Sequence, residues 1–256
     1  MAEPVSIAVL YPELLGTYGD GGNAVVLAQR LRWRNVAAEV VDVHAGEAVP
    51  RSCQLYLMGG GEDAPQALAA RELRSGSALA DAVAGGAAVL AVCAGLQVLG
   101  HRFAGEDGAS HPGLGLLDCE THRDHAPRRV GEVVVSPDPD LGLPELTGYE
   151  NHGGVTVLGP GARPLGKVLV GHGNAGGDGS EGIVADRVVG TYLHGPVLAR
   201  NPALADHLLT SVLGPLAPLD EPDVEALRSE RLHAARHPHL PHRGSGPRWR
   251  RALRGG

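Results

Sequence analysis

Short apolar runs alternate with amphipathic segments along the first hundred residues. The apolar runs predict strands, because each is too short for a buried helix: 5–10, 36–43, 54–58 and 87–92. Between them, apolar residues at helical spacing predict a helix over 23–34, capped by Asn23, and another over 65–83. Strands that are apolar on both faces are typical of a parallel sheet covered by helices. We therefore expect a single-domain α/β fold with an open, mostly parallel sheet and helices on both faces.

The second half of the chain has weaker patterns. Residues 101–121 are rich in glycine and predict a loop, and 133–136 predict a strand. Two later apolar segments, 182–184 and 188–192, predict a hairpin that turns at Asp186 and Arg187. A helix is expected to run through Leu213 with Pro202 at its first position and Asn201 as its cap.

Cys93 follows the 87–92 strand directly, and the small residues after it can open a helix. A reactive side chain between a strand and a helix is the nucleophile-elbow arrangement, which holds it rigidly beside the free N–H groups of a helix start. The alternative is that Cys93 is a small buried hydrophobic residue. In the elbow interpretation, the N–H of Ala94 is a donor to a developing oxyanion.

Three further positions are candidates for chemistry. The Gly59-Gly60-Gly61 triplet after the 54–58 strand is either a flexible turn or a second oxyanion donor, at Gly60. Arg128 is either a surface cation or a bidentate clamp for the carboxylate of an amino acid. His194 lies just past a predicted strand, where a general base could reach Cys93, and His152 is the competing base.

Several segments resemble a known family. A-V-C-A-G-L-Q at 91–97 resembles the nucleophile motif of class I glutamine amidotransferases, G-[IV]-C-x-G-x-Q, with Ala91 where glycine is frequent. R-R-V-G-E at 128–132, Y-E-N-H-G-G at 149–154 and G-T-Y-L-H-G-P at 190–196 resemble its cobyric-acid-synthase-like branch. Within that branch they are most similar to GatD, the glutaminase subunits of lipid II isoglutaminyl synthase. The resemblance covers about residues 5–213.

The resemblance implies a glutaminase. Cys93 would be the nucleophile and His194 the base, Gly60 and Ala94 would hold the oxyanion, and Arg128 rather than Arg129 would hold the substrate, L-glutamine. The ammonia would pass to a Mur-ligase-like synthetase of the MurT type, expected as a heterodimer partner, which amidates the D-glutamate of lipid II in peptidoglycan synthesis. We expect no cofactor and no metal in this chain, with ATP bound by the partner.

Two alternatives stay open. One is the glutaminase of a cobyrinate-type amidation, although those synthetases carry an ATP-binding domain in the same chain and no G-x-x-x-x-G-K-[ST] motif occurs here. The other, of a different class, is a non-catalytic α/β interaction module.

The residue that would orient His194 is not evident. Many class I amidotransferases have Glu two residues after the catalytic histidine, and Pro196 stands at that place here. A base normally needs an orienting acid. Either another carboxylate of this chain supplies it, or a partner does, and the resemblance implies an Asp of the synthetase partner.

Charge divides the chain into an acidic body and a basic end. Residues 228–256 hold 8 of the 22 basic and 1 of the 29 acidic side chains. We expect an amidotransferase domain over 1–227 and a basic tail rich in His, Arg, Pro and Gly, expected to be disordered, over 228–256. The acidic body argues against nucleic acid. No run of 18 apolar residues predicts a membrane span, and three cysteines without disulfide or zinc spacing fit the cytoplasm.

Overall fold

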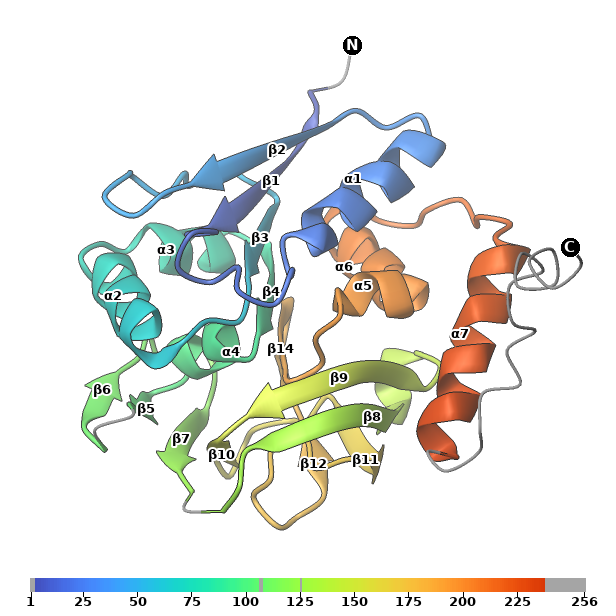
Figure 1. The fold of residues 1–256 in the computed structure, drawn as a ribbon. Coiled ribbons are helices and arrows are strands. Elements are labelled where there is room, and N and C mark those ends of the chain that lie inside the picture. Colours follow the sequence, from blue (N-terminus) through green and yellow to red (C-terminus); the bar gives the residue numbers. More distant parts are fainter. Residues whose placement is uncertain (1–2, 106–107, 125, 238–256) are drawn as a thin grey trace, which may run out of the picture.

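A six-stranded sheet forms the centre of the protein (Figure 1). The structure is a computed structural model, and it describes residues 3–105, 108–124 and 126–237. The strands follow the order β13-β14-β4-β3-β1-β2. Their bounds are β1 Val5–Leu10, β2 Ala38–Val43, β3 Leu55–Met58, β4 Ala88–Val92, β13 Ile183–Ala185 and β14 Val188–Thr191. All neighbours pair in parallel except β13 and β14, which form the predicted hairpin. The predicted open, mostly parallel sheet is confirmed.

The strand order reverses between β1 and β3. From β1 the chain crosses outward to β2, whereas from β3 it crosses the other way to β4. Because such crossovers are right-handed, the connecting helices lie on opposite faces of the sheet. Ligands of open α/β sheets bind beyond the carboxyl ends of the strands at this switch point. The loops after β1, β3 and β4 therefore meet where a site is expected.

Helices cover both faces of the sheet (Figure 1). The helices are α1 Gly22–Trp33, α2 Asp63–Arg74, α3 Ala78–Ala84, α4 Ala94–Leu99, α5 Val197–Arg200, α6 Pro202–Leu213 and α7 Pro222–Arg236, with a 3-10 turn at Pro139–Leu141. In Figure 1, α2, α3 and α4 lie on one side of the sheet and α1, α5 and α6 on the other. None of the helices within the described ranges is long and apolar enough to cross a membrane.

Two of the helix predictions needed correction. The segment predicted as one helix over 65–83 forms α2 and α3, because Ser75, Gly76 and Ser77 interrupt it. Asn23 does not cap α1, which begins one residue earlier after Gly21. Its side-chain oxygen instead accepts a hydrogen bond of 3.0 Å from the Leu198 N–H, so it ties α1 to α5.

Two four-stranded sheets pack below the central sheet in Figure 1, with orders β10-β7-β5-β6 and β12-β11-β8-β9. The first contains β5 Arg102–Ala104, β6 Ser110–Pro112, β7 Cys119–Arg123 and β10 Gly154–Leu158. The second contains β8 Arg129–Pro137, β9 Leu146–His152, β11 Gly166–Val170 and β12 Ser180–Glu181. The prediction of a loop over 101–121 missed β5 and β6, because three-residue strands give no periodic signal, and it also missed the start of β7.

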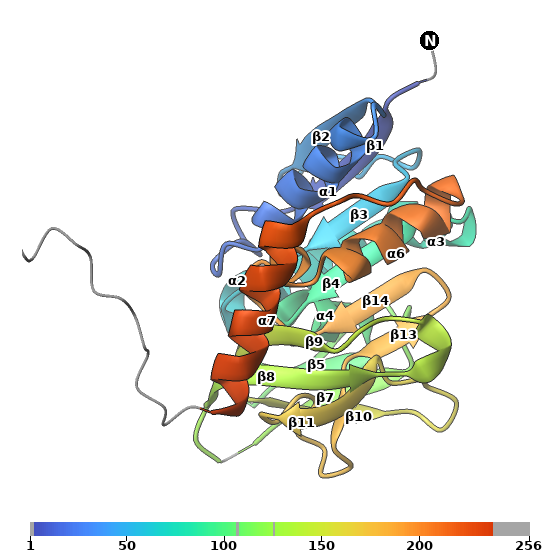
Figure 2. The ribbon, with the colours of Figure 1, turned by 90° about the vertical axis from the view of Figure 1, so that its right-hand side faces the viewer.

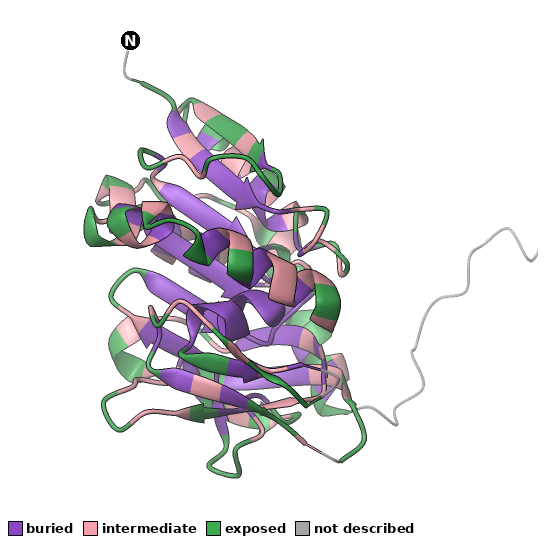
Figure 3. Ribbon diagram, turned by 90° about the vertical axis from the view of Figure 1, so that its left-hand side faces the viewer, coloured by how far each residue is buried: buried purple, intermediate pink, exposed green. Residues whose placement is uncertain are grey.

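The core is concentrated in the central strands. Every residue of β3, β4 and β14 is buried, and Figure 3 shows this layer as a continuous buried band. The outer strand β2 is mostly exposed or half-buried. Cys93 therefore directly follows a strand, β4, that is buried along its whole length.

The predicted domain boundary at 227/228 falls within α7. Figure 2 shows this helix lying alongside the β8–β9 sheet. Leu232 and Ala235 pack against Val134 of β8, so residues 228–236 are helical and anchored. Composition predicted disorder because the stretch is basic, and it does not register that Leu232 and Ala235 are spaced to lie on one face of a helix. The rest of the predicted tail, 238–256, lies outside the described residues.

Candidate active site

Cys93 sits in a strained turn between β4 and α4. Its backbone has φ 53° and ψ −104°, a conformation that residues with a Cβ atom rarely adopt. The Cys93 N–H donates a 2.8 Å hydrogen bond to the carbonyl of Thr191, which fixes the turn to β14. A Cβ at Gly95 would lie 2.8 Å from that of Met58, so α4 can pack this closely only with glycine there. The geometry is that of a nucleophile elbow.

His194 follows β14 and lies against a carboxylate of the same chain. Its Nδ1 is 3.1 Å from Oδ2 of Asp20, and the exposed fractions of the two side chains are 3% and 1%. A carboxylate facing Nδ1 selects the tautomer with hydrogen on Nδ1. Nε2 is left as the reactive nitrogen. It is buried and makes no well-aligned hydrogen bond with any residue that the structure describes.

The environment of His194 favours its charged form. Burial lowers the pKa of its imidazole, but the hydrogen bond with Asp20, the nearby Cys93 side chain and the charges of both groups outweigh burial and raise the pKa to about 10. A histidine that stays protonated near neutral pH can stabilise a thiolate beside it and protonate a leaving group. This shift also indicates that Cys93 and His194 interact.

The glycine triplet after β3 lets the loop after β1 approach closely. A Cβ at Gly59 would collide with the carbonyl oxygen of Leu15, and one at Gly61 would lie 2.5 Å from that of Leu14. A Cβ at Gly60 would lie 2.6 Å from Cε1 of His194. The triplet therefore has a packing role that neither sequence interpretation included: it seats the loop that carries Asp20.

The two predicted oxyanion donors differ in what they bind. The Gly60 N–H donates a 2.9 Å hydrogen bond to Oδ2 of Asp20, so it cannot donate to an oxyanion at the same time. Ala94 is the first residue of α4, where N–H groups have no partner within the helix. The Ala94 N–H can thus serve as an oxyanion donor as the structure stands, whereas the Gly60 N–H can do so only after Asp20 releases it.

Arg128 lies next to this site. Its Nε donates to Oδ1 of Asn151 at 2.6 Å, and one terminal nitrogen donates to the Tyr18 hydroxyl at 3.0 Å. The ring of Tyr18 packs on His194 with centroids 4.7 Å apart, and its hydroxyl is 3.0 Å from Glu62. Tyr18 therefore connects Arg128 with the base.

Arg129 points to a different partner. Its guanidinium pairs with Asp124 at 2.5 Å and is mostly buried. The Arg128 side chain is exposed, and within the described part of the chain its hydrogen bonds go to Asn151 and Tyr18 and to no carboxylate. A clamp must offer its charge to the substrate. The arrangement supports the choice of Arg128 over Arg129.

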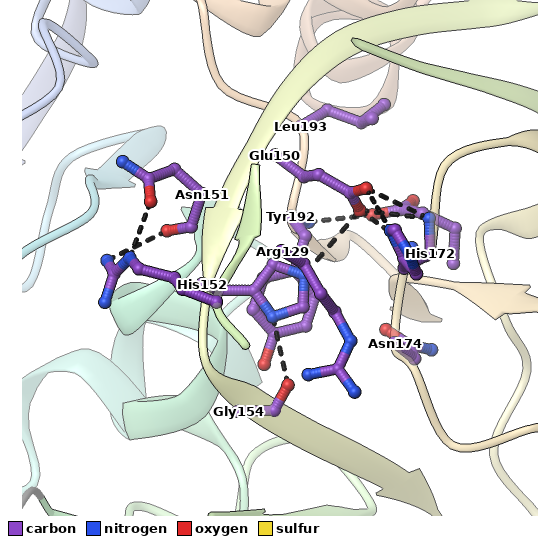
Figure 4. A network of polar contacts seen from close by, with 12 residues as sticks. Arg129, Glu150, Asn151, His152, Gly154, His172, Asn174, Tyr192 and Leu193 are labelled. Atoms are coloured by element: carbon purple, nitrogen blue, oxygen red, sulfur yellow. Dashed lines mark hydrogen bonds and ion pairs between the residues drawn. The ribbon is translucent and has the colours of Figure 1, made fainter. Parts of the chain in front are cut away.

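His152, the competing base, is held in a separate network (Figure 4). Its Nδ1 lies 3.0 Å from the Gly154 carbonyl, and its Nε2 is 3.7 Å from Glu150. Its ring stacks on Tyr192 with centroids 4.0 Å apart. Hydrogen bonds to Glu150 from the His172 side chain, 2.7 Å away, and from the Gly173 N–H complete the network. With its nitrogens directed to these groups, His152 is the weaker candidate for the base.

A cavity of about 170 Å³ brings Cys93, Ala94 and Arg128 together, whereas His194 and Gly60 are not among the described residues that line it. It is lined by Cys93, Ala94, Arg128 and His152, with Gln97 and Gly61 among the other residues. The cavity thus places a thiol, a helix start and an exposed guanidinium around one space. Within the described ranges, no group of three or more His, Cys, Asp or Glu side chains is placed so that it could hold a metal ion.

Asp20 is the residue that sequence reasoning missed. It lies in a loop rich in turn formers, where an acidic residue looks like an ordinary turn residue. The available signal was topological: the loop follows β1, which is next to β3 at the switch point of the sheet. Strand order, and not any motif, brings Asp20 to His194, which is 174 residues away.

The chain is similar in sequence to known proteins. A model of the CobB/CobQ-like glutamine amidotransferase domain matches residues 6–202. The chain is 38% identical over 197 residues to the GatD subunit of lipid II isoglutaminyl synthase (glutamine-hydrolyzing) from Staphylococcus aureus (strain N315), covering 76% of this chain and 79% of that relative. It is 34% identical over 214 residues to the GatD subunit from Streptococcus pneumoniae (strain ATCC BAA-255 / R6), covering 82% and 80%.

A solved structure described as a glutamine amidotransferase has a similar fold. It superimposes with a TM-score of 0.53 at 19% identity, over 80% of this chain and 98% of that one. This likeness concerns the fold alone.

Proposed function

The chain belongs to the CobB/CobQ-like glutamine amidotransferase family, and on that premise we propose that it is the glutaminase subunit of a lipid II isoglutaminyl synthase. It hydrolyses L-glutamine to glutamate and supplies ammonia for amidation of the D-glutamate of lipid II. The observation that carries the proposal is the strained Cys93 beside the buried His194, at a cavity that Arg128 also lines.

Acylation begins with attack of the Cys93 sulfur on the side-chain amide carbon of glutamine. The negative charge that develops on the amide oxygen is stabilised by the N–H of Ala94, and by that of Gly60 once Asp20 releases it. His194 gives the proton on Nε2 to the amide nitrogen. The carbon–nitrogen bond breaks, ammonia leaves, and a γ-glutamyl thioester remains on Cys93.

Deacylation uses Cys93 and His194 again, with His194 now acting as a base instead of an acid. His194 takes a proton from water at Nε2, and the resulting hydroxyl attacks the thioester carbon. The carbon–sulfur bond breaks, glutamate leaves, and the thiolate and imidazolium are restored. The net reaction consumes one glutamine and one water and yields glutamate and ammonia.

Arg128 holds the α-carboxylate of glutamine in this scheme. A guanidinium binds a carboxylate with two parallel hydrogen bonds, which fixes orientation as well as position. Its contacts with Asn151 and Tyr18 hold the side chain in place without neutralising its charge.

Released ammonia is useful only if a second enzyme consumes it. We therefore propose a heterodimer with a Mur-ligase-like synthetase of the MurT type, which binds ATP and activates the D-glutamate carboxylate. This chain itself needs no cofactor for the chemistry described. A cytoplasmic location stays a prediction. A cobyrinate-type amidation is the weaker alternative, because the two relatives named above are both subunits of a lipid II synthase.

The test is to combine the purified chain with its synthetase partner, ATP, lipid II and glutamine labelled with ¹⁵N in the side-chain amide. We expect the label in the isoglutaminyl amide of lipid II, and none when Cys93→Ala replaces the wild type. Activity of Cys93→Ala with added ammonium chloride is the control for an intact partner. Transfer of the label by Cys93→Ala would contradict the proposal.

A further inference from the structure

We propose that Asn151 is the positioning residue of Arg128. It holds one edge of the guanidinium with uncharged oxygen atoms, so that the charge of Arg128 stays available to the α-carboxylate of glutamine. The inference rests on the proposed glutaminase function, in which Arg128 binds that carboxylate. Asn151 acts through the guanidinium, and its neutrality is the property that matters.

Asn151 contacts Arg128 with two of its own oxygen atoms. The Nε–H of Arg128 donates to Oδ1 of Asn151 at 2.6 Å, and Nη2 donates to the Asn151 carbonyl at 3.1 Å. Nε and Nη2 form one edge of the planar guanidinium, and Nη1 and Nη2 form another. With the first edge held, the second can bind a carboxylate through two parallel hydrogen bonds. A carboxylate there takes the place of the Tyr18 hydroxyl, which lies 3.0 Å from Nη2 and is also bonded to Glu62.

The acceptors of Arg128 within the described ranges are all uncharged. They are the two Asn151 oxygens and the Tyr18 hydroxyl. The neighbouring Arg129 shows the alternative, because its guanidinium forms an ion pair with Asp124 at 2.5 Å. A carboxylate in the place of the Asn151 amide would form the same kind of pair with Arg128 and compete with the substrate. An amide oxygen accepts the hydrogen bond and leaves the positive charge uncompensated.

Strand β9 gives Asn151 a fixed place relative to the base. The side chains of Asn151 and Glu150 lie on opposite sides of this strand (Figure 4). Two residues before Asn151, Tyr149 exchanges backbone hydrogen bonds of 2.9 and 3.2 Å with His194. One strand therefore carries both the anchor of Arg128 and the backbone partner of His194, so Asn151 sets where the clamp lies relative to the reacting groups.

The experiment compares Asn151→Asp and Asn151→Ala with the wild-type full chain, each in complex with the synthetase partner. Asp has the shape of Asn and keeps an acceptor oxygen, so it changes the charge. Ala removes the side-chain acceptor and leaves the charge unchanged. Asn35→Asp is the matched control, because Asn35 is exposed and does not line the Cys93 cavity. Circular dichroism and thermal unfolding establish that each variant is folded.

We expect the isosteric variant to be more damaging than the truncation. Asn151→Ala should raise KM for glutamine about 2- to 10-fold, because a guanidinium that is no longer held must be immobilised when the substrate binds. Asn151→Asp should raise KM about 10- to 100-fold, which is the effect of losing a charge-assisted pair with the substrate. Asn35→Asp should match the wild type. A wild-type KM for Asn151→Asp, or a larger rise for Asn151→Ala than for Asn151→Asp, would overturn the proposal.

A second substrate separates the charge of Arg128 from general damage to the site. In the α-amide of L-glutamine, a neutral carboxamide replaces the α-carboxylate, so the guanidinium gains no ion pair from it. Asn151→Asp should therefore change kcat/KM for the α-amide by less than about 3-fold, while kcat/KM for glutamine falls about 10- to 100-fold. Equal losses for the two substrates would mean that the replacement disturbs the site without regard to charge, and would contradict the role of Asn151.

A binding measurement keeps this inference separate from the proposed function. Glutamine is titrated calorimetrically into the Cys93→Ala chain with and without Asn151→Asp, so that no turnover is needed. We expect Asn151→Asp to raise Kd about 10- to 100-fold. If this difference persisted while the wild type transferred no ammonia to lipid II, the proposed function would fail and the role of Asn151 would stand. If transfer were intact and Kd unchanged, the role of Asn151 alone would fail.

Discussion

Gly60 lies directly against the imidazole of His194. A methyl group added at Gly60 would place its carbon 2.6 Å from Cε1 of that ring and 3.0 Å from the Tyr18 ring. We therefore predict that Gly60→Ala displaces the base and lowers kcat by about 10²-fold, the effect of a misplacement of about 1 Å. Gly21→Ala is the control, since a Cβ there meets nothing within 4 Å. Equal ammonia release by Gly60→Ala and wild type would show that the ring does not need this position.

Replacement of Cys93 tests the nucleophile. Cys93→Ala and Cys93→Ser should abolish ammonia release from glutamine, because neither side chain provides a thiolate. Cys53→Ala and Cys119→Ala should retain it, because both residues are buried in the core and neither lines the Cys93 cavity. The measurement is a coupled assay of ammonia, with unfolding curves to show that the fold persists. Turnover near wild type in Cys93→Ala would exclude the assignment.

Replacement of Arg128 tests the clamp. Arg128→Ala should raise KM for glutamine by about 10- to 100-fold, because the loss of a charge-assisted pair costs about 1.5–3 kcal/mol. Arg128→Lys should recover only part of this, since an ammonium lacks the two-pronged geometry of a guanidinium. Steady-state kinetics measure both. A rise in KM for Arg129→Ala, but not for Arg128→Ala, would mean that the other arginine binds the substrate.

Glu181 makes the stability of the fold dependent on pH. It is completely buried, with Oε1 bonded to the Thr191 hydroxyl and the Tyr192 N–H. Burial, aided by the charge of Glu150, raises its pKa to about 7 despite those hydrogen bonds. Because the folded pKa is raised, the contribution of protonated Glu181 is fully present below the unfolded pKa and is lost as pH rises through about 7.

Glu181→Gln should remove this dependence. We predict that the wild type loses up to about 3 kcal/mol between pH 4.5 and 8 through this group, and that the variant does not. Urea unfolding at pH 5 and pH 8 measures the difference, with the exposed Glu39→Gln as the control. Parallel losses in Glu181→Gln and wild type would show that Glu181 does not carry the effect.

Sequence patterns predicted the parts of the fold that depend on local order. The apolar runs placed β1 and β4 within one residue of their observed bounds, and the Cys93 elbow follows from the small residues beside it. The two four-stranded sheets were largely missed, because their stability comes from pairing between distant strands and their shortest members carry no apolar run. Only the 133–136 strand and the β13–β14 hairpin had clear local signals.

Some residues of the candidate site could likewise be predicted from local sequence, and others could not. Cys93, His194 and Arg128 lie in motifs that can be read locally, and the structure places Cys93 and Arg128 at one cavity. The contact between Asp20 and His194 depends on which strand ends lie side by side, a property of the assembled sheet. The hydrogen bond from the Gly60 N–H to Asp20 also depends on the assembled sheet, so the sequence could not predict it.

The most direct test of a glutaminase site at Cys93 is labelling of the purified chain with a chloroketone analogue of glutamine, followed by mass spectrometry of the peptides. Burial raises the pKa of the Cys53 thiol, and burial together with nearby acidic residues raises that of Cys119 to about 12, so both should react slowly. We predict one fast adduct, at Cys93, in a 1:1 ratio with the chain, and protection by L-glutamine. Labelling that spreads over the three cysteines, or that glutamine does not slow, would contradict the account.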